Sequence, residues 1–232
     1  MFTTPAYDKE ALRLVIQEAN SVAQELQLPE QLPITETNIL ASFITPFPMR
    51  RHARGAVGNV TTPNYIYCVS IDGKFSYLER NRQDSERLRW ASECSQAVSH
   101  LDTNTGQQIF ETNTAFALLD TNAAYQLATQ WLADVSMDVS GLNQNYPHLV
   151  HPTLVWGSRG ELRFVPLYWI SWSHKYGEAS TAYVEVFLPT KTLVQLRVED
   201  SKYILRKPLV VTNLDFLLSQ TNVSTGLNLP AK

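Results

Sequence analysis

The sequence predicts an α+β fold, in which an antiparallel sheet is packed by long helices. Four segments rich in β-branched and aromatic residues follow one another between residues 153 and 199, which is typical of a meander. A hairpin is predicted around Asp72-Gly73, and segments with helical apolar spacing, 8–28 and 121–142, precede the two groups of strands. Strands that are grouped, rather than alternating with helices, favour an antiparallel sheet over a parallel one.

The first helix is predicted over residues 8–28, where Asp8 can cap the start and Pro29 follows the end. Its apolar face is formed by residues at helical spacing, namely Leu12, Val15, Ile16, Ala19, Val22 and Leu26. The proline-punctuated stretch that follows is expected to be extended or looped, with a short strand at 38–44.

The hairpin prediction depends on Asp72-Gly73, because a two-residue Asp-Gly loop suits a type I′ turn. In that register Cys68 faces Tyr77 and Ser70 faces Phe75. Both faces of the hairpin are apolar, so we expect each face to be covered.

Two more helices are predicted, over 84–101 and over 121–142, the latter with Thr121 or Asn122 as cap and Gly141 as stop. Asp134 and Asp138 would lie one turn apart on the solvent side of the second of these helices. The segment 110–119 is ambiguous, and 213–220 is expected to be a short helix.

The meander strands are expected at 153–156, 162–173, 181–188 and 192–199. The order along the chain divides it into an N-terminal helix-hairpin-helix unit, 1–105, and a helix with the meander, 106–232. Two similar helix-sheet units and one continuous domain both agree with this order.

Composition limits the classes of function. The net charge of -3 gives no general attraction to nucleic acid, so no nucleic acid partner is expected. No run of 18 apolar residues exists, so no membrane span is expected. Charged residues make up only 18% of the chain, and Ser, Thr, Asn and Gln fill the deficit. A surface of this composition is commoner in proteins outside the cytoplasm. We expect an extracytoplasmic (periplasmic or secreted) protein if a signal was removed, and otherwise a cytoplasmic one.

The run from Ala179 to Val198 resembles the end of a PepSY domain, in which a helix packs on a short antiparallel sheet. The resemblance covers about residues 121–200, with the 121–142 segment as the partner helix. The usual Asp-x-x-Thr-Gly turn of that family appears here as Leu188-Pro-Thr-Lys-Thr192. The resemblance implies a non-catalytic, extracytoplasmic module that acts on proteases or other protein partners.

A dense aromatic group in the meander is the main candidate for a functional feature. Alternation places Tyr168, Ile170 and Trp172 on one face of the sheet, and Leu167 and Trp169 on the other. One face packs on a helix as core, and the other can bind sugars, peptides or bases. The face with Tyr168, Trp172 and Tyr183 is the predicted ligand or partner surface.

A basic cluster supplies the second predicted surface. Arg50, Arg51 and Arg54 can hold a phosphate, a carboxylate or an acidic partner, or form a solvated loop. Cys68 and Cys94 are too few for a disulfide scaffold, which leaves two half-buried thiols or a single disulfide.

Histidines are the remaining candidates for chemistry. His148 and His151 could share a metal on a helix, but Pro147 and Pro152 favour an extended segment in which the rings diverge. No metal site and no cofactor is therefore expected.

No nucleophile elbow, phosphate loop, dinucleotide fingerprint or zinc-protease motif occurs. We therefore expect a non-catalytic binding or interaction module for an unknown protein, peptide or small ligand, of unspecified oligomeric state. The alternative is a small hydrolase or ligand-processing enzyme, with a cleft where two or more of His148, His151, His174 and Glu178 converge.

Overall fold

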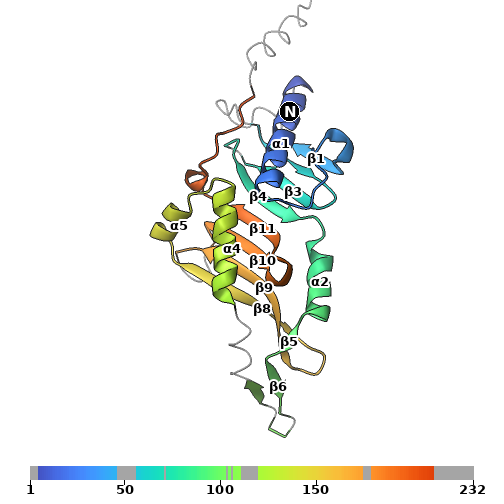
Figure 1. The fold of residues 1–232 in the computed structure, drawn as a ribbon, viewed down its shortest axis with the longest axis vertical. Coiled ribbons are helices and arrows are strands. Elements are labelled where there is room, and N and C mark those ends of the chain that lie inside the picture. The colour runs from blue at the N-terminus through green and yellow to red at the C-terminus, as the bar shows by residue number, and fades with distance from the viewer. Residues whose placement is uncertain are drawn as a thin grey trace, which may run out of the picture.

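The computed structural model describes residues 5–45, 56–70, 72–102, 104–105, 107–110, 120–174 and 179–211. It confirms the α+β class with a large antiparallel sheet (Figure 1). The α-helices of the described part are α1 (Pro5–Glu25), α2 (Gln83–Glu93), α4 (Thr121–Asp134) and α5 (Val139–Asn145). Short 3₁₀ turns are η1 (Glu36–Asn38), η2 (Leu188–Thr190) and η3 (Ser201–Tyr203). No helix among these residues has the length and apolarity needed to cross a membrane.

The strands form one main sheet and one separate small hairpin. The N-terminal strands are β1 (Ala41–Ile44), β2 (Gly58–Thr61), β3 (Tyr65–Val69) and β4 (Phe75–Arg80). The meander strands are β8 (His148–Trp156), β9 (Leu162–Trp172), β10 (Ala182–Phe187) and β11 (Thr192–Val198). Between them, β5 (Gln96–Ala97) joins the main sheet, while β6 (Ser99–Leu101) and β7 (Gln108–Phe110) pair with each other.

The two groups of strands meet in the middle of the main sheet. The order is β1-β2-β3-β4-β11-β10-β9, with β8 paired to the outer side of β9. The junction is the antiparallel pair of β4 and β11, in which Leu78 faces Leu196. Each half thus has a long helix and four sequential antiparallel strands, with the short α5 between α4 and β8, and the last strands of both halves join.

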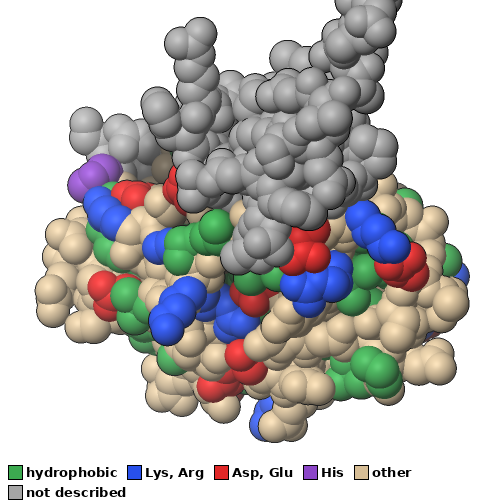
Figure 2. Space-filling view, turned by 90° about the horizontal axis from the view of Figure 1, so that it is seen from above, with side chains coloured by type: hydrophobic (Ala, Val, Ile, Leu, Met, Phe, Trp, Pro, Cys, Tyr) green, Lys and Arg blue, Asp and Glu red, His purple; other side chains and the backbone are tan. Residues whose placement is uncertain are grey.

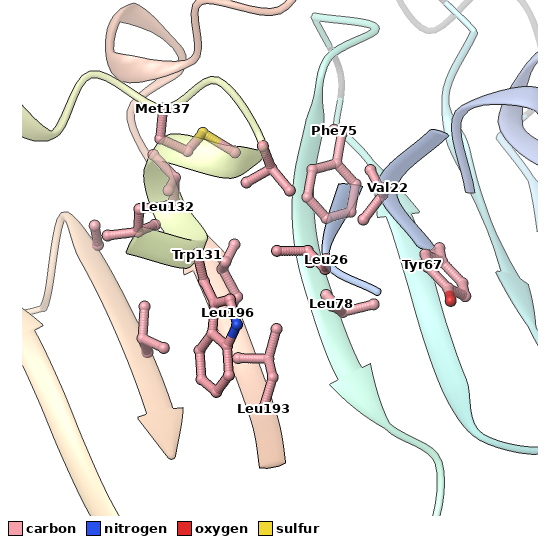
Figure 3. Close-up of a cluster of buried hydrophobic side chains, with 14 of the residues drawn as sticks. Val22, Leu26, Tyr67, Phe75, Leu78, Trp131, Leu132, Met137, Leu193 and Leu196 are labelled. Atoms are coloured by element: carbon pink, nitrogen blue, oxygen red, sulfur yellow. The ribbon is translucent and has the colours of Figure 1, made fainter. Parts of the chain in front are cut away.

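One face of the sheet carries the main core. Figure 1 shows α1 and α4 lying across the same face, α1 over the N-terminal strands and α4 over the meander. Figure 3 shows their buried side chains as one cluster, with Val22 and Leu26 of α1 near Leu78 and with Trp131 of α4 beside Leu196. Burial of this apolar surface under both helices is what holds the two halves together.

The opposite face is only partly covered. Helix α2 packs Trp90 against it, and the Trp90 ring stacks on Phe187 with centroids 4.1 Å apart. Val165, Leu167 and Val194 complete this small second core. The rest of that face, beyond α2, carries polar and aromatic side chains, as an antiparallel sheet with one solvated face does.

The helix prediction over 84–101 is wrong beyond Glu93. Its apolar stripe began at Leu88, but Leu88 is exposed and Trp90 is the buried residue of α2. After Cys94 the chain becomes extended and pairs Gln96 and Ala97 with β9. Tertiary pairing with the sheet therefore overrides a weak helical pattern.

The predicted helix over 121–142 is two helices. Asp120, one residue earlier than the predicted cap, accepts a hydrogen bond from the Ala123 N–H, and α4 ends at Asp134. Asp138 caps α5 by accepting from the Gly141 N–H at 2.8 Å. Gly141 lies in the first turn of α5, where an added Cβ would sit 2.2 Å from the Asp138 carboxylate. Asp138 is thus a capping residue and not half of a carboxylate pair.

The Asp72-Gly73 hairpin is present with a different turn. Cys68 faces Tyr77 as predicted, but a bulge after Cys68 places Val69, and not Ser70, opposite Phe75. Cys68 and Tyr77 stay half-buried, so only the face beneath α1 is fully covered.

The segment after β11 ties the two halves together. The Arg206 side chain is 10% exposed and pairs with Glu18 and Glu25 of α1. The Leu205 N–H donates to the Ser136 carbonyl, and the Leu209 N–H donates to the Gly73 carbonyl. The helix predicted at 213–220 lies outside the described residues.

Candidate functional site

Two of the predicted surface aromatics are core residues. Tyr168 and Trp172 are 1% and 0% exposed, on the sheet face that α4 covers. The Trp172 Nε1 donates to Asn143 Oδ1 at 2.8 Å, and the Asp120 N–H donates to the Tyr168 hydroxyl at 3.1 Å. The prediction that these two side chains form a binding surface is wrong, because buried side chains with satisfied polar atoms cannot meet a ligand.

Tyr183 lies on the opposite face from Tyr168 and Trp172. In the register of β10 against β9, Tyr183 faces Ser171, and Glu185 faces Trp169. The alternation predicted for β9 is confirmed. Helix α4, however, packs on the face of Tyr168 and Trp172, which is the predicted binding face. Trp169, which is 50% exposed, is therefore the solvent-accessible tryptophan of β9 instead of Trp172.

A groove runs between α2 and this second face. Its volume is about 530 Å³, within the range of small-ligand sites. The groove is lined by side chains of α2 and of four strands, namely Arg87, Leu88, Ala91, Thr153, Val155, Val165, Leu167, Trp169, Tyr183, Glu185 and Gln195. Most of these side chains are apolar or aromatic, and the polar ones come from β8, β10, β11 and the first half of α2.

The aromatic wall of the groove is formed by Trp169 and Tyr183. Their ring centroids are 5.5 Å apart and the planes are inclined by 57°. Burial raises the pKa of Tyr183, although a hydrogen bond with Arg197 opposes the rise, so its hydroxyl is protonated at neutral pH. The pair offers two aromatic rings to the groove.

An ion pair forms the polar part of the groove. The Arg87 guanidinium donates a hydrogen bond to Glu185 Oε2. Burial raises the pKa of the Glu185 carboxyl, and the charge and hydrogen bond of Arg87 oppose that rise. The pair brings together α2 and β10, whose residues here are 98 positions apart in the chain.

No protein-family model, curated protein or solved structure matches the chain.

The histidines do not converge on the groove. Strand β8 begins at His148, and the predicted extended conformation of this segment is confirmed. His148 pairs with Trp172 and His151 with Trp169, so the two rings lie on opposite faces of the sheet. Within the described residues, no three His, Cys, Asp or Glu side chains are grouped as metal ligands.

Other predicted residues fall elsewhere or are not described. Arg50, Arg51 and Arg54 lie outside the described residues, as does Glu178. Figure 2, seen from above, shows Lys and Arg side chains interspersed with Asp and Glu rather than gathered in one patch.

Both cysteines are free thiols and half-buried, so the disulfide alternative is wrong. Burial, with a contribution from the nearby Glu79 carboxylate, raises the pKa of Cys68 to about 11.

Sequence reasoning missed most of the groove. The alternation in β9 places Leu167 and Trp169 on the opposite face from Tyr168 and Ile170. This pattern is a usable signal for two residues of the groove. No sequence pattern predicts the ion pair of Arg87 and Glu185, because only the packing of α2 on the sheet brings these two residues together.

Proposed function

We propose that the protein is a non-catalytic binding module that holds an apolar part of a ligand in the groove between α2 and the sheet. The observation that carries the proposal is the half-exposed Trp169 above an apolar floor, beside a half-buried ion pair. An exposed large aromatic in a concave apolar surface is the usual composition of a binding site.

The proposal keeps the broad partner class expected from the sequence, a protein, a peptide or a small ligand. Location outside the cytoplasm and the PepSY-like character of residues 121–200 remain predictions that belong with it. A groove that opens to solvent along α2 accepts a side chain of a larger partner as readily as a small molecule.

A neutral fluorescent dye such as Nile red tests the proposal directly. We expect saturable binding, which Leu88→Gln and Trp169→Ala weaken about fivefold or more, because each removes apolar surface from the groove. Leu88 is 74% exposed on α2, so its replacement leaves the fold intact.

Two exposed residues outside the groove supply matched controls. Leu205→Gln and Trp156→Ala remove similar side chains and should leave dye binding unchanged. If all four variants bind the dye alike, the groove is not the site. Hydrolysis of a generic ester or peptide that Trp169→Ala abolishes would instead favour a hydrolase.

A further inference from the structure

We propose that the group bound in the groove is an organic cation, an ammonium or guanidinium carried on an apolar body. The inference rests on the proposed function and adds the charge of the ligand. It follows from three features of the groove: the balance of charge, the carboxylate of Glu185 and the arrangement of the two aromatic rings.

The charges around the polar part of the groove are mostly negative. Glu185, Glu79 and Asp84 all interact electrostatically with the single guanidinium of Arg87. Burial raises the pKa of Glu79, the charge of Arg87 opposes the rise, and repulsion from Asp84 and Glu185 adds to it. Three carboxylates around one guanidinium leave a net negative potential, which favours a cationic ligand and opposes an anionic one.

Other basic groups do not reverse this balance. Arg197 faces Tyr183 across the β10–β11 pair and is hydrogen-bonded to it, but its charge is paired with Glu199 and it lies over the ring of Tyr77. The Nε of Arg87 is buried without a hydrogen-bond partner among the described residues, so an incoming anion cannot reach it. The two terminal nitrogens of the guanidinium face carboxylates, Nη2 bonded to Glu185 and Nη1 3.8 Å from Asp84, so an anion would compete with both.

The Glu185 carboxylate can receive a second cationic donor. Oε2 accepts from Arg87, while Oε1 accepts no hydrogen bond from the described residues, and the side chain lines the groove. An ammonium or guanidinium N–H would donate to Oε1 in a charge-assisted hydrogen bond.

The aromatic rings lie beside this carboxylate. Trp169 faces Glu185 across the β9–β10 pair, and Tyr183 is two residues away on the same face. Ring faces are negative and attract cations within about 6 Å. Two inclined rings next to a carboxylate resemble the aromatic cages that hold alkylammonium groups, and the floor of Val155, Val165 and Leu167 suits an apolar body.

Three probes of similar size and different charge test the inference: 4-phenylbutylamine, 4-phenylbutanol and 4-phenylbutyrate, titrated at pH 7 by calorimetry or NMR. We expect the amine to bind about fivefold or more tighter than the alcohol, and the butyrate to bind most weakly. Added salt should reduce the difference between amine and butyrate, since part of it is long-range attraction.

Variants locate the effect in the groove. Glu185→Gln should lower the affinity for the amine to about that for the alcohol. Asp84→Asn should reduce the preference in part, and because the Asp84 side chain is 93% exposed this variant folds regardless. Glu10→Gln removes one negative charge from α1, far from the groove lining, and should change nothing.

The outcomes separate the two proposals. Equal binding of all three probes, lost in Leu88→Gln, would overturn the cationic ligand and leave the binding module standing. Tightest binding of the butyrate would overturn it as well and would make Arg87 an anion site. Probe binding that is insensitive to both Leu88→Gln and Trp169→Ala would overturn the proposed function itself.

Discussion

Replacement of Trp172 by alanine tests the assignment of the two sheet faces. The side chain is fully buried beneath α4, its ring lies 6.2 Å from that of Tyr125, and its Nε1 donates to Asn143. Removal of a fully buried tryptophan costs about 3–5 kcal/mol, through lost apolar burial and the cavity that remains. Asn143 keeps a hydrogen bond from the Tyr125 hydroxyl, so no orphaned acceptor adds to the cost.

Trp169 is the matched comparison, three positions away on the same strand. Half of its surface is already exposed, so Trp169→Ala should cost about 1–2 kcal/mol at ~25 cal/mol per Å² of buried apolar area. For a chain of this size the expected fall in Tm is about 6–20 °C for Trp172→Ala and about 2–8 °C for Trp169→Ala.

Urea denaturation followed by far-UV circular dichroism measures both variants, and dye binding provides the second readout. Trp172→Ala should lose stability while the remaining folded protein still binds Nile red, and Trp169→Ala should show the reverse. If Trp169→Ala proved the more destabilising of the two, the face that α4 covers would be wrongly assigned.

Two further predictions concern the junction of the halves and the half-buried thiol. Arg206→Met should lower the free energy of unfolding by about 3–5 kcal/mol, since the buried Glu18 loses its partner. Arg13→Met, at an exposed pair, should leave the free energy of unfolding nearly unchanged, and urea denaturation compares the two variants. In a Cys94→Ser background, Cys68 should react with a maleimide at pH 7.5 about a hundredfold more slowly than a free thiol, because its pKa is raised from 9.0 to about 11. A rate close to that of glutathione would contradict the burial of Cys68.

Local patterns were sufficient to predict four meander strands and the first helix, although β8 begins at His148, five residues before the predicted start at 153. Both signals are short-range: alternation of side chains in β9 and helical spacing in α1 depend only on neighbouring residues. The junction of β4 with β11 is different, because Leu78 and Leu196 are partners that no local pattern connects. One continuous sheet therefore could not be distinguished from two separate ones.

The choice of face failed for a related reason. Both faces of β9 carry large aromatics, so alternation separated Tyr168 and Trp172 from Trp169 without saying which set meets a helix. The deciding fact is where α4 crosses the sheet, which is a tertiary property. The break before α5 did have a local signal, the Asp138-x-x-Gly141 cap, but continuous apolar spacing through Val139 concealed it.

The pH dependence of stability provides a test of the Glu185 site that needs no ligand. Burial raises the pKa of Glu185 above its ordinary value of 4.5, so the folded protein holds this proton more tightly than the unfolded chain does. The charged form therefore disfavours folding at neutral pH, and this penalty is relieved as the pH falls from above the folded pKa towards 4.5. Glu79 has a raised pKa as well and contributes in the same direction.

Comparison with Glu185→Gln isolates the contribution of this one carboxyl, since Glu79, Asp84 and Arg87 are present in both proteins. The wild type should gain stability relative to the variant between pH 7 and about pH 4.5, and the difference should be constant below that value. Urea denaturation at intervals of half a pH unit measures it. A wild type that instead loses stability relative to Glu185→Gln over this range would mean that Arg87 outweighs burial, so that the carboxylate is fully satisfied by its ion pair. The same protonation of Glu185 predicts how binding depends on pH. Affinity for 4-phenylbutylamine should fall as Glu185 takes up its proton, and this fall should occur at a higher pH than for an exposed glutamate.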